Sequence, residues 1–478
     1  MPDFDISNRE LSIALPETVN EDLKNHLIRE DGQEDLTFAL WTPSVGDNRR
    51  TGLVHTILPP EDGDRQVHGN ASFNSQYFER ACARAMEEEC GIAFLHSHPF
   101  PGWQRMSSDD IEAENRIAGT TSTLTDLPLL GMTVGSDGTW SARFWEHTGQ
   151  GHFERRWTPV VRSVGKRLEP HFADHLAPKP DFKDLFRRTV TVWGEDNHAD
   201  LARLRIGIVG LGSVGSIVAE TIARSGLGNL VLIDFDTVEP HNLDRLLNAT
   251  EADLGQPKTM VAERRIRRVA TASQVDITRK EASIAEEEGY RAALDCDVLF
   301  SCVDRPRPRY ILNHIAYRHL IPVVDGGIEV RFKNENFSGA DWQTQTVGPG
   351  RPCLECLGAY SPSDVSAEMD GLLEDPSYLD GLSEDHPYKQ NENVLPFSMN
   401  LASMEVMQMV ALVTGAARID DFGVQRYRYM PGIMEAEWDR TCDSDCLYRK
   451  HVATGDEVLA PELDGDLESV SENGKSSC

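Results

Sequence analysis

The stretch Arg205–Asp236 constrains the fold of this chain more than any other. A short β-branched run leads into three glycines, Gly210, Gly212 and Gly215. A helix-compatible segment and a second apolar run, which ends on Asp234, follow them. This order predicts a strand, a glycine turn, a helix and a parallel strand with an acid at its tip. Such a unit brings a helix N-terminus to a nucleotide phosphate and the acid to a ribose hydroxyl. We therefore expect an adenine-nucleotide site.

The polar residues beyond this stretch favour ATP over a dinucleotide. Asp236, Asn242 and Arg245 come soon after the second strand, Lys258 stands in LGQPK, and Asp304 ends a buried-looking strand. A dehydrogenase only binds its pyrophosphate, whereas adenylyl transfer must neutralise charge that grows on the β- and γ-phosphates. Arginine, lysine and a carboxylate-held magnesium ion do this. The pattern therefore indicates ATP and Mg²⁺.

Residues 185 to about 446 resemble the ThiF-type adenylyltransferases, the family of the ubiquitin-activating enzymes and the activators of sulphur carriers. The segments that match in order and spacing are RRTVTVWG, GLGSVGS, DFDTVEPHNLDR, LGQPK, CVDRPRPR and PVVDGG. The resemblance implies a Rossmann-like adenylation domain and a homodimer, in which Arg188 reaches the γ-phosphate bound by the partner subunit. It implies ATP contacts at Gly212, Asp234, Asp236, Asn242, Arg245, Lys258 and Asp304.

The charge of the chain excludes some partners. It has 78 acidic and 47 basic side chains and a net charge of -31, which argues against nucleic acid or an anionic membrane as a partner. The first residues lack the basic and apolar regions of a signal peptide, and no apolar run approaches the about 18 residues that a membrane span requires. We therefore expect a soluble cytoplasmic protein with a protein partner.

The length allows two or three domains. We expect an α/β domain over residues 1–160, a linker and pre-strand arm over 161–200, and the nucleotide domain over 201–450. The acidic end, 451–478, has few apolar residues and predicts disorder. Prolines and glycines interrupt residues 361–390, which indicates a mobile surface crossing.

A second set of chemical residues lies in HSHPFPGWQRMSSDD, residues 96–110. His96 and His98 stand at i and i+2 at a strand end, so their side chains point to the same side. With a carboxylate from the following helix they supply three zinc ligands and leave the fourth position for water. Zinc makes that water a nucleophile, and a nearby carboxylate can deliver its proton to a leaving amine. A lone histidine is usually a core residue, but that interpretation fits this pattern poorly.

This segment resembles the JAMM (MPN+) metalloproteases, which remove ubiquitin or related proteins from lysine side chains. The resemblance implies an N-terminal JAMM/MPN α/β domain with Glu34 as general base and Ser107 as helix cap and oxyanion donor. It implies Asp110 as the third zinc ligand, because the serine-to-aspartate step is kept. One extra residue precedes the serine, so Asp109 is the alternative ligand, and Glu30 is the alternative base. A metal-free MPN scaffold is the competing interpretation.

Four of the nine cysteines form two close pairs, Cys353 with Cys356 and Cys442 with Cys446. Two such clamps predict a four-thiolate structural zinc, and the ThiF resemblance implies the same site. The second pair has three intervening residues where two are usual, so one of the four could instead be a catalytic thiol.

Many ubiquitin-activating enzymes pass their carrier to a cysteine in the crossing segment, but no cysteine lies between Cys356 and Cys442 here. The remaining cysteines are predicted to be core residues, except for the last, which ends the acidic tail: Cys82, Cys90, Cys296, Cys302 and Cys478. We therefore expect direct transfer of the activated carrier to a conjugating enzyme's cysteine or a sulphur donor.

Together these features favour a bifunctional enzyme of a bacterial ubiquitin-like pathway. The second domain would adenylate the C-terminus of a ubiquitin-like protein, and the first would cut a peptide or isopeptide bond next to that C-terminus. Antiviral defence is a hypothesis by analogy with such fusions. Two alternatives stay open: activation of a sulphur carrier with trimming of its precursor, and a catalytically silent scaffold that binds a carrier.

Overall fold

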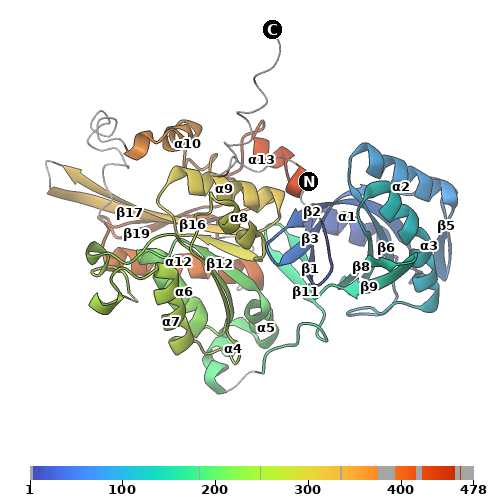
Figure 1. The fold of residues 1–478 in the computed structure, drawn as a ribbon, viewed down its shortest axis with the longest axis horizontal. Coiled ribbons are helices and arrows are strands. Elements are labelled where there is room, and N and C mark those ends of the chain that lie inside the picture. The colour runs from blue at the N-terminus through green and yellow to red at the C-terminus, as the bar shows by residue number, and fades with distance from the viewer. Residues whose placement is uncertain are drawn as a thin grey trace, which may run out of the picture. The chain divides into compact units, whose positions relative to one another are not determined.

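The computed structural model describes residues 4–181, 184–247, 249–333, 336–374, 393–415, 422–457 and 463. The chain divides into two compact units (Figure 1). The first unit comprises residues 1–179, 318–320 and 451–459, and the second comprises residues 180–317, 321–450 and 460–478. Each unit combines helices with one large sheet, which confirms the α/β class. Within the described residues, no helix is long and apolar enough to cross a membrane.

The first unit contains a nine-stranded sheet in the order β11-β10-β1-β3-β2-β6-β7-β8-β9. Its strands are β1 (Glu10–Pro16), β2 (Leu36–Val45), β3 (Arg49–Leu58), β6 (Gly91–Ser97), β7 (Leu129–Val134), β8 (Trp140–Gly149), β9 (His152–Trp157), β10 (Val160–Val164) and β11 (Leu168–Phe172). A separate hairpin joins β4 (Arg65–His68) to β5 (Asn70–Phe73). The helices are α1 (Glu17–Leu27), α2 (Ser75–Glu87) and α3 (Ser108–Thr125).

Apolar side chains cover both faces of this sheet, because successive residues of a strand point to opposite faces. Trp41 of β2 lies in one core cluster, which includes residues of α1. Phe38 and Leu40 of the same strand lie in the other cluster, which includes residues of α2 and α3. The helix α3 is therefore packed on the sheet, and its N-terminus lies at the end of β6.

The structure differs from the predicted linker over residues 161–200. β10 pairs with β1 in parallel, and β11 extends the sheet beyond β10. Further along, α4 (Arg187–Trp193) and α5 (Glu195–Arg203) belong to the second unit. The strand VVRSV has only five residues, and its place in the sheet depends on pairing with β1, which lies about 150 positions earlier, so local composition did not reveal it.

The start of the predicted disordered tail also differs from the structure. Residues 451–457 belong to the first unit and lie against β2. The Thr42 hydroxyl donates to the Ala453 carbonyl oxygen at 2.7 Å, and the Val45 amide donates to the Asp456 carboxylate at 2.7 Å. Acidic composition suggested disorder, but Asp456 accepts a backbone hydrogen bond there. Residues 458–462 and 464–478, with Cys478, lie outside the described residues.

Replacing Gly455 by alanine should destabilise the first unit. Gly455 has φ +49°, and a Cβ there would overlap the Pro43 carbonyl oxygen of β2. We expect Gly455→Ala to cost at least about 2 kcal/mol in urea denaturation of the full chain. Gly63→Ala is the matched control, because φ is +88° and the space around it is open; it should cost only about 1 kcal/mol. Equal losses for the two variants would contradict the docking of residues 451–457.

The second unit contains an eight-stranded sheet in the order β14-β13-β12-β15-β16-β17-β18-β19. Its strands are β12 (Arg205–Val209), β13 (Asn229–Ile233), β14 (Asp276–Lys280), β15 (Val298–Ser301), β16 (Val323–Lys333), β17 (Asn336–Val347), β18 (Val424–Arg428) and β19 (Ile433–Glu437). Its longer helices are α6 (Ser213–Arg224), α7 (Lys258–Val269), α8 (Glu287–Leu294), α9 (Pro306–Arg318), α10 (Pro362–Met369) and α12 (Leu395–Thr414), and the short α13 (Leu447–Lys450) follows them.

The strand, turn, helix and strand predicted for Arg205–Asp236 are confirmed as β12, α6 and β13. The first five strands in the sheet order, β14-β13-β12-β15-β16, run parallel. β12 therefore has β13 on one side and β15 on the other. The chain order therefore reverses between β12 and β15. In open parallel sheets, ligands bind at the carboxyl ends of the strands at such a reversal. Of the predicted crossing, residues 375–390 lie outside the described residues.

Candidate functional site

The glycine turn after β12 is tightly packed at two positions and open at the third. Gly210 has φ +86°, and a Cβ there would press on the Cys302 carbonyl group. A Cβ on Gly215 would overlap the Gly210 carbonyl oxygen. Gly212 caps the N-terminus of α6, and a Cβ there would meet nothing within 4 Å. A phosphate can therefore approach the backbone and the helix N-terminus at Gly212.

Asp234 holds this turn against the end of β13. Its carboxylate accepts the Leu211 amide at 2.5 Å and the Asp236 amide at 2.8 Å. Burial raises the pKa of Asp234, although the charge of Lys258 and the hydrogen bonds from the two backbone amides lower it. Each carboxylate oxygen has a second lone pair. Asp234 can therefore orient the turn and still accept a ribose hydroxyl.

Lys258 and Asp236 are brought together by the loop that joins β13 to α7. The Lys258 ammonium lies 2.6 Å from the Asp236 carboxylate, and the Lys258 amide donates to the Asp236 carbonyl oxygen at 2.9 Å. The lysine side chain is 11% exposed and the aspartate side chain is 49% exposed. A triphosphate would compete with this exposed carboxylate for the ammonium group.

Asn242 and Arg245 lie on the same loop, around a short 3-10 turn at Pro240–Asn242. The Asn242 side-chain oxygen accepts the Glu239 amide at 3.0 Å. The Arg245 guanidinium donates to the His241 carbonyl oxygen at 2.7 Å and lies 3.2 Å from the Asp244 carboxylate. These contacts hold the loop in shape and leave Arg245 partly exposed.

Asp304 is exposed on the loop between β15 and α9. Since β15 neighbours β12, this loop lies across the strand reversal from the glycine turn. The Arg307 amide, in the first turn of α9, donates to the Glu368 carboxylate of α10 at 2.8 Å. Arg188 is exposed on α4. Of the residues predicted from the sequence, the glycines therefore lie on one side of the strand reversal and Asp304 lies on the other.

The first unit brings two histidines and an aspartate together at the end of β6. The His96 Nε2 atom lies 3.4 Å from one Asp110 carboxylate oxygen, and the His98 Nε2 atom lies 3.2 Å from the other. One potential ligand atom of each residue lies within 4.8 Å of the other two. The His98 amide donates to the Val134 carbonyl oxygen at 2.9 Å, which continues the pairing with β7. Asp109 is exposed and outside this group.

Ser107 explains how the aspartate reaches the histidines. Its hydroxyl oxygen accepts the Asp110 amide at 3.1 Å, and its own amide donates to the Asp110 carboxylate at 2.7 Å. This capping box fixes the first turn of α3. Two imidazole nitrogens and one carboxylate oxygen are a ligand set that suits zinc. The three side chains therefore fit the metal that the JAMM resemblance implies.

Glu34 precedes β2 and is half-buried near these residues. Its amide donates to the Gly69 carbonyl oxygen at 3.3 Å. Burial raises the pKa of Glu34; the charge of His98 lowers it and the charge of Asp110 raises it. A raised pKa suits a carboxylate that takes and returns a proton. Glu30, the alternative base, is exposed.

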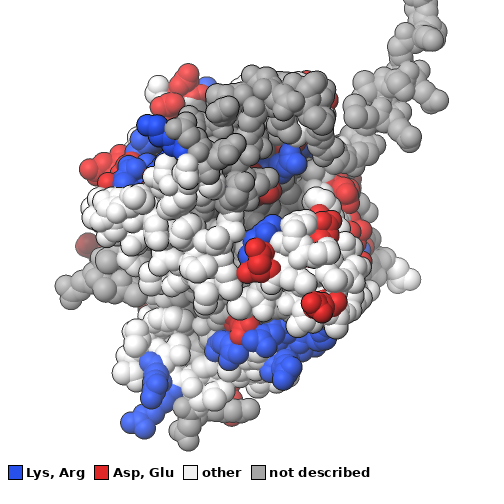
Figure 2. All heavy atoms as spheres, turned by 90° about the vertical axis from the view of Figure 1, so that its left-hand side faces the viewer, with Lys and Arg blue, Asp and Glu red and all other residues white. Residues whose placement is uncertain are grey.

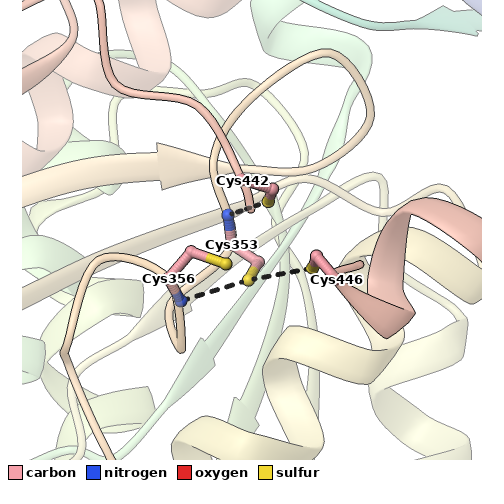
Figure 3. Close-up of side chains that lie close together, drawn as sticks. All are labelled: Cys353, Cys356, Cys442 and Cys446. Carbon is pink, nitrogen blue, oxygen red and sulfur yellow. Dashed lines mark hydrogen bonds between the residues drawn. The ribbon is translucent and has the colours of Figure 1, made fainter. Parts of the chain in front are cut away.

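The four paired cysteines converge in the second unit (Figure 3). The Cys353 and Cys446 sulfur atoms lie 3.7 Å apart, and all four sulfur atoms lie within 4.8 Å of one another. Tetrahedral zinc with Zn–S bonds of about 2.3 Å requires sulfur separations of about 3.8 Å. The Cys353 amide donates to the Cys442 sulfur at 3.1 Å, and the Cys356 amide donates to the Cys353 sulfur at 3.4 Å. The four thiols therefore fit one structural zinc, despite the longer second clamp.

The ThiF family model matches residues 186–425, half of the chain. The chain belongs to the ThiF family. It is similar to a sulfur carrier protein ThiS adenylyltransferase of Bacillus subtilis, with 32% identity over 34% of this chain and 46% of that protein. It is also similar to a molybdopterin-synthase adenylyltransferase of Escherichia coli, with 31% identity over 34% and 61%. A SAMP-activating enzyme E1 of Haloferax volcanii shows 30% identity over 35% and 58%. The chain thus spans about half the length of these relatives.

The ThiF domain also contains a buried polar cluster that sequence reasoning missed. The Arg309 guanidinium lies 3.2 Å from the Asp325 carboxylate and donates to the Gly326 carbonyl oxygen at 3.1 Å. Glu405 of α12 is fully buried, and a Cβ on Gly326 would overlap its carboxylate. Burial raises the pKa of Glu405 well above its ordinary value, and Asp325 adds to this effect. Glu405 is the single acidic residue of the apolar helix α12, and this feature of the sequence could have indicated a buried acid.

Glu405→Gln should make the ThiF domain more stable at high pH. As pH rises above the ordinary glutamate pKa of about 4.3, the unfolded chain loses this proton and the folded chain keeps it, so stability falls. Glutamine removes this effect. We expect the melting temperature of the variant to exceed that of the unchanged chain by at least about 4 °C at pH 8 and to match it near pH 4.5. The exposed Glu251→Gln variant is the control. A variant that melts lower at pH 8 would contradict a neutral Glu405.

Proposed function

We propose that this chain adenylates the C-terminal carboxylate of a small ubiquitin-like or sulphur-carrier protein, and hydrolyses a peptide or isopeptide bond next to that C-terminus. The adenylation proposal is based on the groups that lie together beside the strand reversal. An open glycine turn, the buried Asp234 and the Lys258–Asp236 pair lie on adjoining segments there. The relatives support it, since one is named for adenylylating a sulfur carrier protein, one for adenylylating molybdopterin synthase and one for activating SAMP.

In the adenylation step, a carboxylate oxygen of the carrier attacks the α-phosphorus of ATP. The new bond joins that oxygen to phosphorus, and the bond from the α-phosphorus to the oxygen bridging it to the β-phosphate breaks, so pyrophosphate leaves. The amide groups at Gly212 receive phosphate, and Asp234 accepts the ribose hydroxyl. Lys258 and Arg245 offset charge on the leaving group. Asp304 would hold Mg²⁺, which neutralises phosphate charge when bound.

In the hydrolytic site, His96, His98 and Asp110 would hold Zn²⁺, which when bound increases the acidity of a water molecule. Glu34 takes the proton of the attacking water on a carboxylate oxygen and passes it to the leaving amine. The Ser107 hydroxyl already accepts the Asp110 amide, so its hydrogen is available for a developing oxyanion.

The exposed surface of the second unit fits a protein substrate. The side that carries β17 and β19 shows broad areas without charged side chains (Figure 2). Large apolar side chains are exposed on or between the strands from β17 to β19: Phe337, Tyr429, Met430, Ile433 and Met434. Exposed apolar groups of this kind mark protein-binding surfaces. We propose that the carrier docks here.

Three further proposals concern partners and setting. The sequence has no cysteine between Cys356 and Cys442, so we propose that the activated carrier passes directly to a conjugating enzyme's cysteine or to a sulphur donor. A homodimer would let Arg188 of one subunit serve the other's γ-phosphate. We place both activities in the cytoplasm, in a bacterial ubiquitin-like pathway. Antiviral defence is one setting in which such a pathway would operate.

Trapping the product tests the proposal. The full chain is incubated with ATP, Mg²⁺, hydroxylamine and each candidate carrier, and the carrier is analysed by mass spectrometry. An adenylated C-terminus reacts with hydroxylamine, so a carrier hydroxamate is expected. A carrier extended beyond its C-terminus should be cut at that position without ATP. Absence of both products with every carrier of the same genome would support the silent scaffold.

A sulphur-carrier role is the second candidate, because two of the named relatives act on a sulfur carrier or in molybdopterin synthesis. Its product would be a C-terminal thiocarboxylate. A ubiquitin-like pathway would instead produce a lysine conjugate, so the mass of the carrier product in a sulphide-supplemented extract separates the two.

A further inference from the structure

A fully buried ion pair lies next to the candidate metal ligands of the first unit. Arg143 of β8 and Glu114 of α3 both have 0% side-chain exposure. The Arg143 Nε atom donates to one Glu114 carboxylate oxygen at 3.0 Å, and its Nη2 atom pairs with the other. The Trp145 indole also donates to Glu114, at 2.6 Å. Gly131 of β7 provides the space, since a Cβ there would overlap the Glu114 carboxylate.

The network contacts the candidate metal site at one end. The Arg143 Nη1 atom donates to the Thr133 hydroxyl at 2.6 Å. The Thr133 hydroxyl in turn lies 3.4 Å from His96 Nε2. The side chain of one of the three candidate ligands is thus joined, through a single hydroxyl, to a buried guanidinium.

The other end of the network fixes the helix that carries the third candidate ligand. Glu114 follows Asp110 by four residues in α3, so the two side chains lie on the same face one turn apart. Contacts from Arg143 and Trp145 set the rotation of α3 about its axis. That rotation decides whether Asp110 faces His96 and His98.

Stability alone does not explain this pair. Removing two charges from water costs several kcal/mol, and apolar side chains of similar size often replace a buried pair with no loss of stability. The neighbouring core clusters of the first unit are apolar and pack both faces of the sheet. Two apolar side chains of similar size would give such a core about the same stability.

We propose that Arg143 and Glu114 are positioning residues, which hold His96 and Asp110 at the separation that a metal ion requires. The proposal rests on the proposed metal site. Removing the pair should weaken metal binding more than it changes folding stability. Arg143 also holds the Thr133 hydroxyl beside His96 Nε2, the nitrogen that faces Asp110, so Thr133 limits where the imidazole ring can lie.

The test compares the full chain with the double variant Arg143→Met/Glu114→Leu, which replaces the pair by apolar side chains. Zinc affinity is measured by competition with a chromophoric chelator, and Co²⁺ loading by its visible absorption spectrum. We expect zinc affinity at this site to fall about 10- to 100-fold and the Co²⁺ bands to shift, while the melting temperature changes by only a few degrees. The four-cysteine cluster, with its thiolate bands, serves as an internal reference.

A second pair of variants covers the case in which the double variant does not fold. Trp145→Phe removes the indole N–H that donates to Glu114, and Trp140→Phe removes one that donates to Asn20 instead. Weaker zinc binding by the Trp145 variant than by the Trp140 variant supports the proposal. Zinc affinity unchanged in a folded double variant, or equal in the two phenylalanine variants, overturns it. If His98→Ala does not lower the zinc content of the chain, the metal site itself is wrong, which is a separate outcome.

Discussion

Lys258→Ala is expected to lower carrier-dependent adenylation at least about 100-fold. The Lys258 ammonium is held 2.6 Å from Asp236 on the loop beside the glycine turn, where the charge of leaving pyrophosphate would develop. Loss of one donor that acts on such charge costs about 10²–10³ in kcat. Because this interaction strengthens as pyrophosphate departs, kcat should fall more than the KM for ATP rises. Initial rates of hydroxamate formation measure both constants.

Lys280→Ala provides the matched control for this experiment. Lys280 also lies in the second unit, is 15% exposed, and pairs with Glu288 at 3.2 Å. Its replacement should change the rate by less than about twofold, because its ammonium group pairs with Glu288 and is not among the groups proposed to contact the phosphates. If Lys258→Ala retains half of the activity, or if both variants fall equally, Lys258 does not act on the phosphates.

In the first unit, His98→Ala should remove one zinc ion per chain and reduce cleavage of an extended carrier to background. Glu34→Gln should behave differently: the zinc content stays unchanged, because Glu34 is not a ligand, and cleavage falls about 10²- to 10⁴-fold with loss of the general base. Zinc is measured by elemental analysis of the purified full chain, and cleavage by mass spectrometry. Hydroxamate formation should be unaffected in both variants, because Lys258 and Arg245 remain.

The exposed His152→Ala is the control histidine variant, since His152 lies on β9 of the same sheet. It should keep both zinc and cleavage. Unchanged zinc content in His98→Ala would exclude the metal site, whereas full cleavage by Glu34→Gln would leave the metal site and exclude the proposed base.

Local patterns predicted the candidate sites because their residues are close in sequence. The glycines, Asp234 and Lys258 all lie within the segments that form β12, α6, β13 and the start of α7. The serine-to-aspartate step of the JAMM resemblance favoured Asp110 over Asp109, and the capping box at Ser107 fixes the turn that carries Asp110. In each case, the geometry of a single turn or strand end determines where the side chains lie.

The features that were missed depend on residues far apart in sequence. Glu114 and Arg143 are separated by 29 positions and meet only when α3 packs on β8. Residues 451–457 are acidic and resemble a solvated tail, yet Asp456 hydrogen-bonds to β2, 411 positions earlier. The strand β10 lies in the segment predicted as linker, and its partner β1 begins at residue 10. Composition cannot reveal such pairings, since the stabilising contact lies elsewhere in the chain.

Exchange of radiolabelled pyrophosphate into ATP detects carrier adenylation itself, because it requires reversible formation of the carrier adenylate on the enzyme. We predict label in ATP only when a carrier with an intact C-terminal carboxylate is present. The exchange should be lost in Lys258→Ala and kept in His98→Ala. Exchange without any carrier, or no exchange with every ubiquitin-like and sulphur-carrier protein of the same genome, would show that this chain does not adenylate a carrier C-terminus.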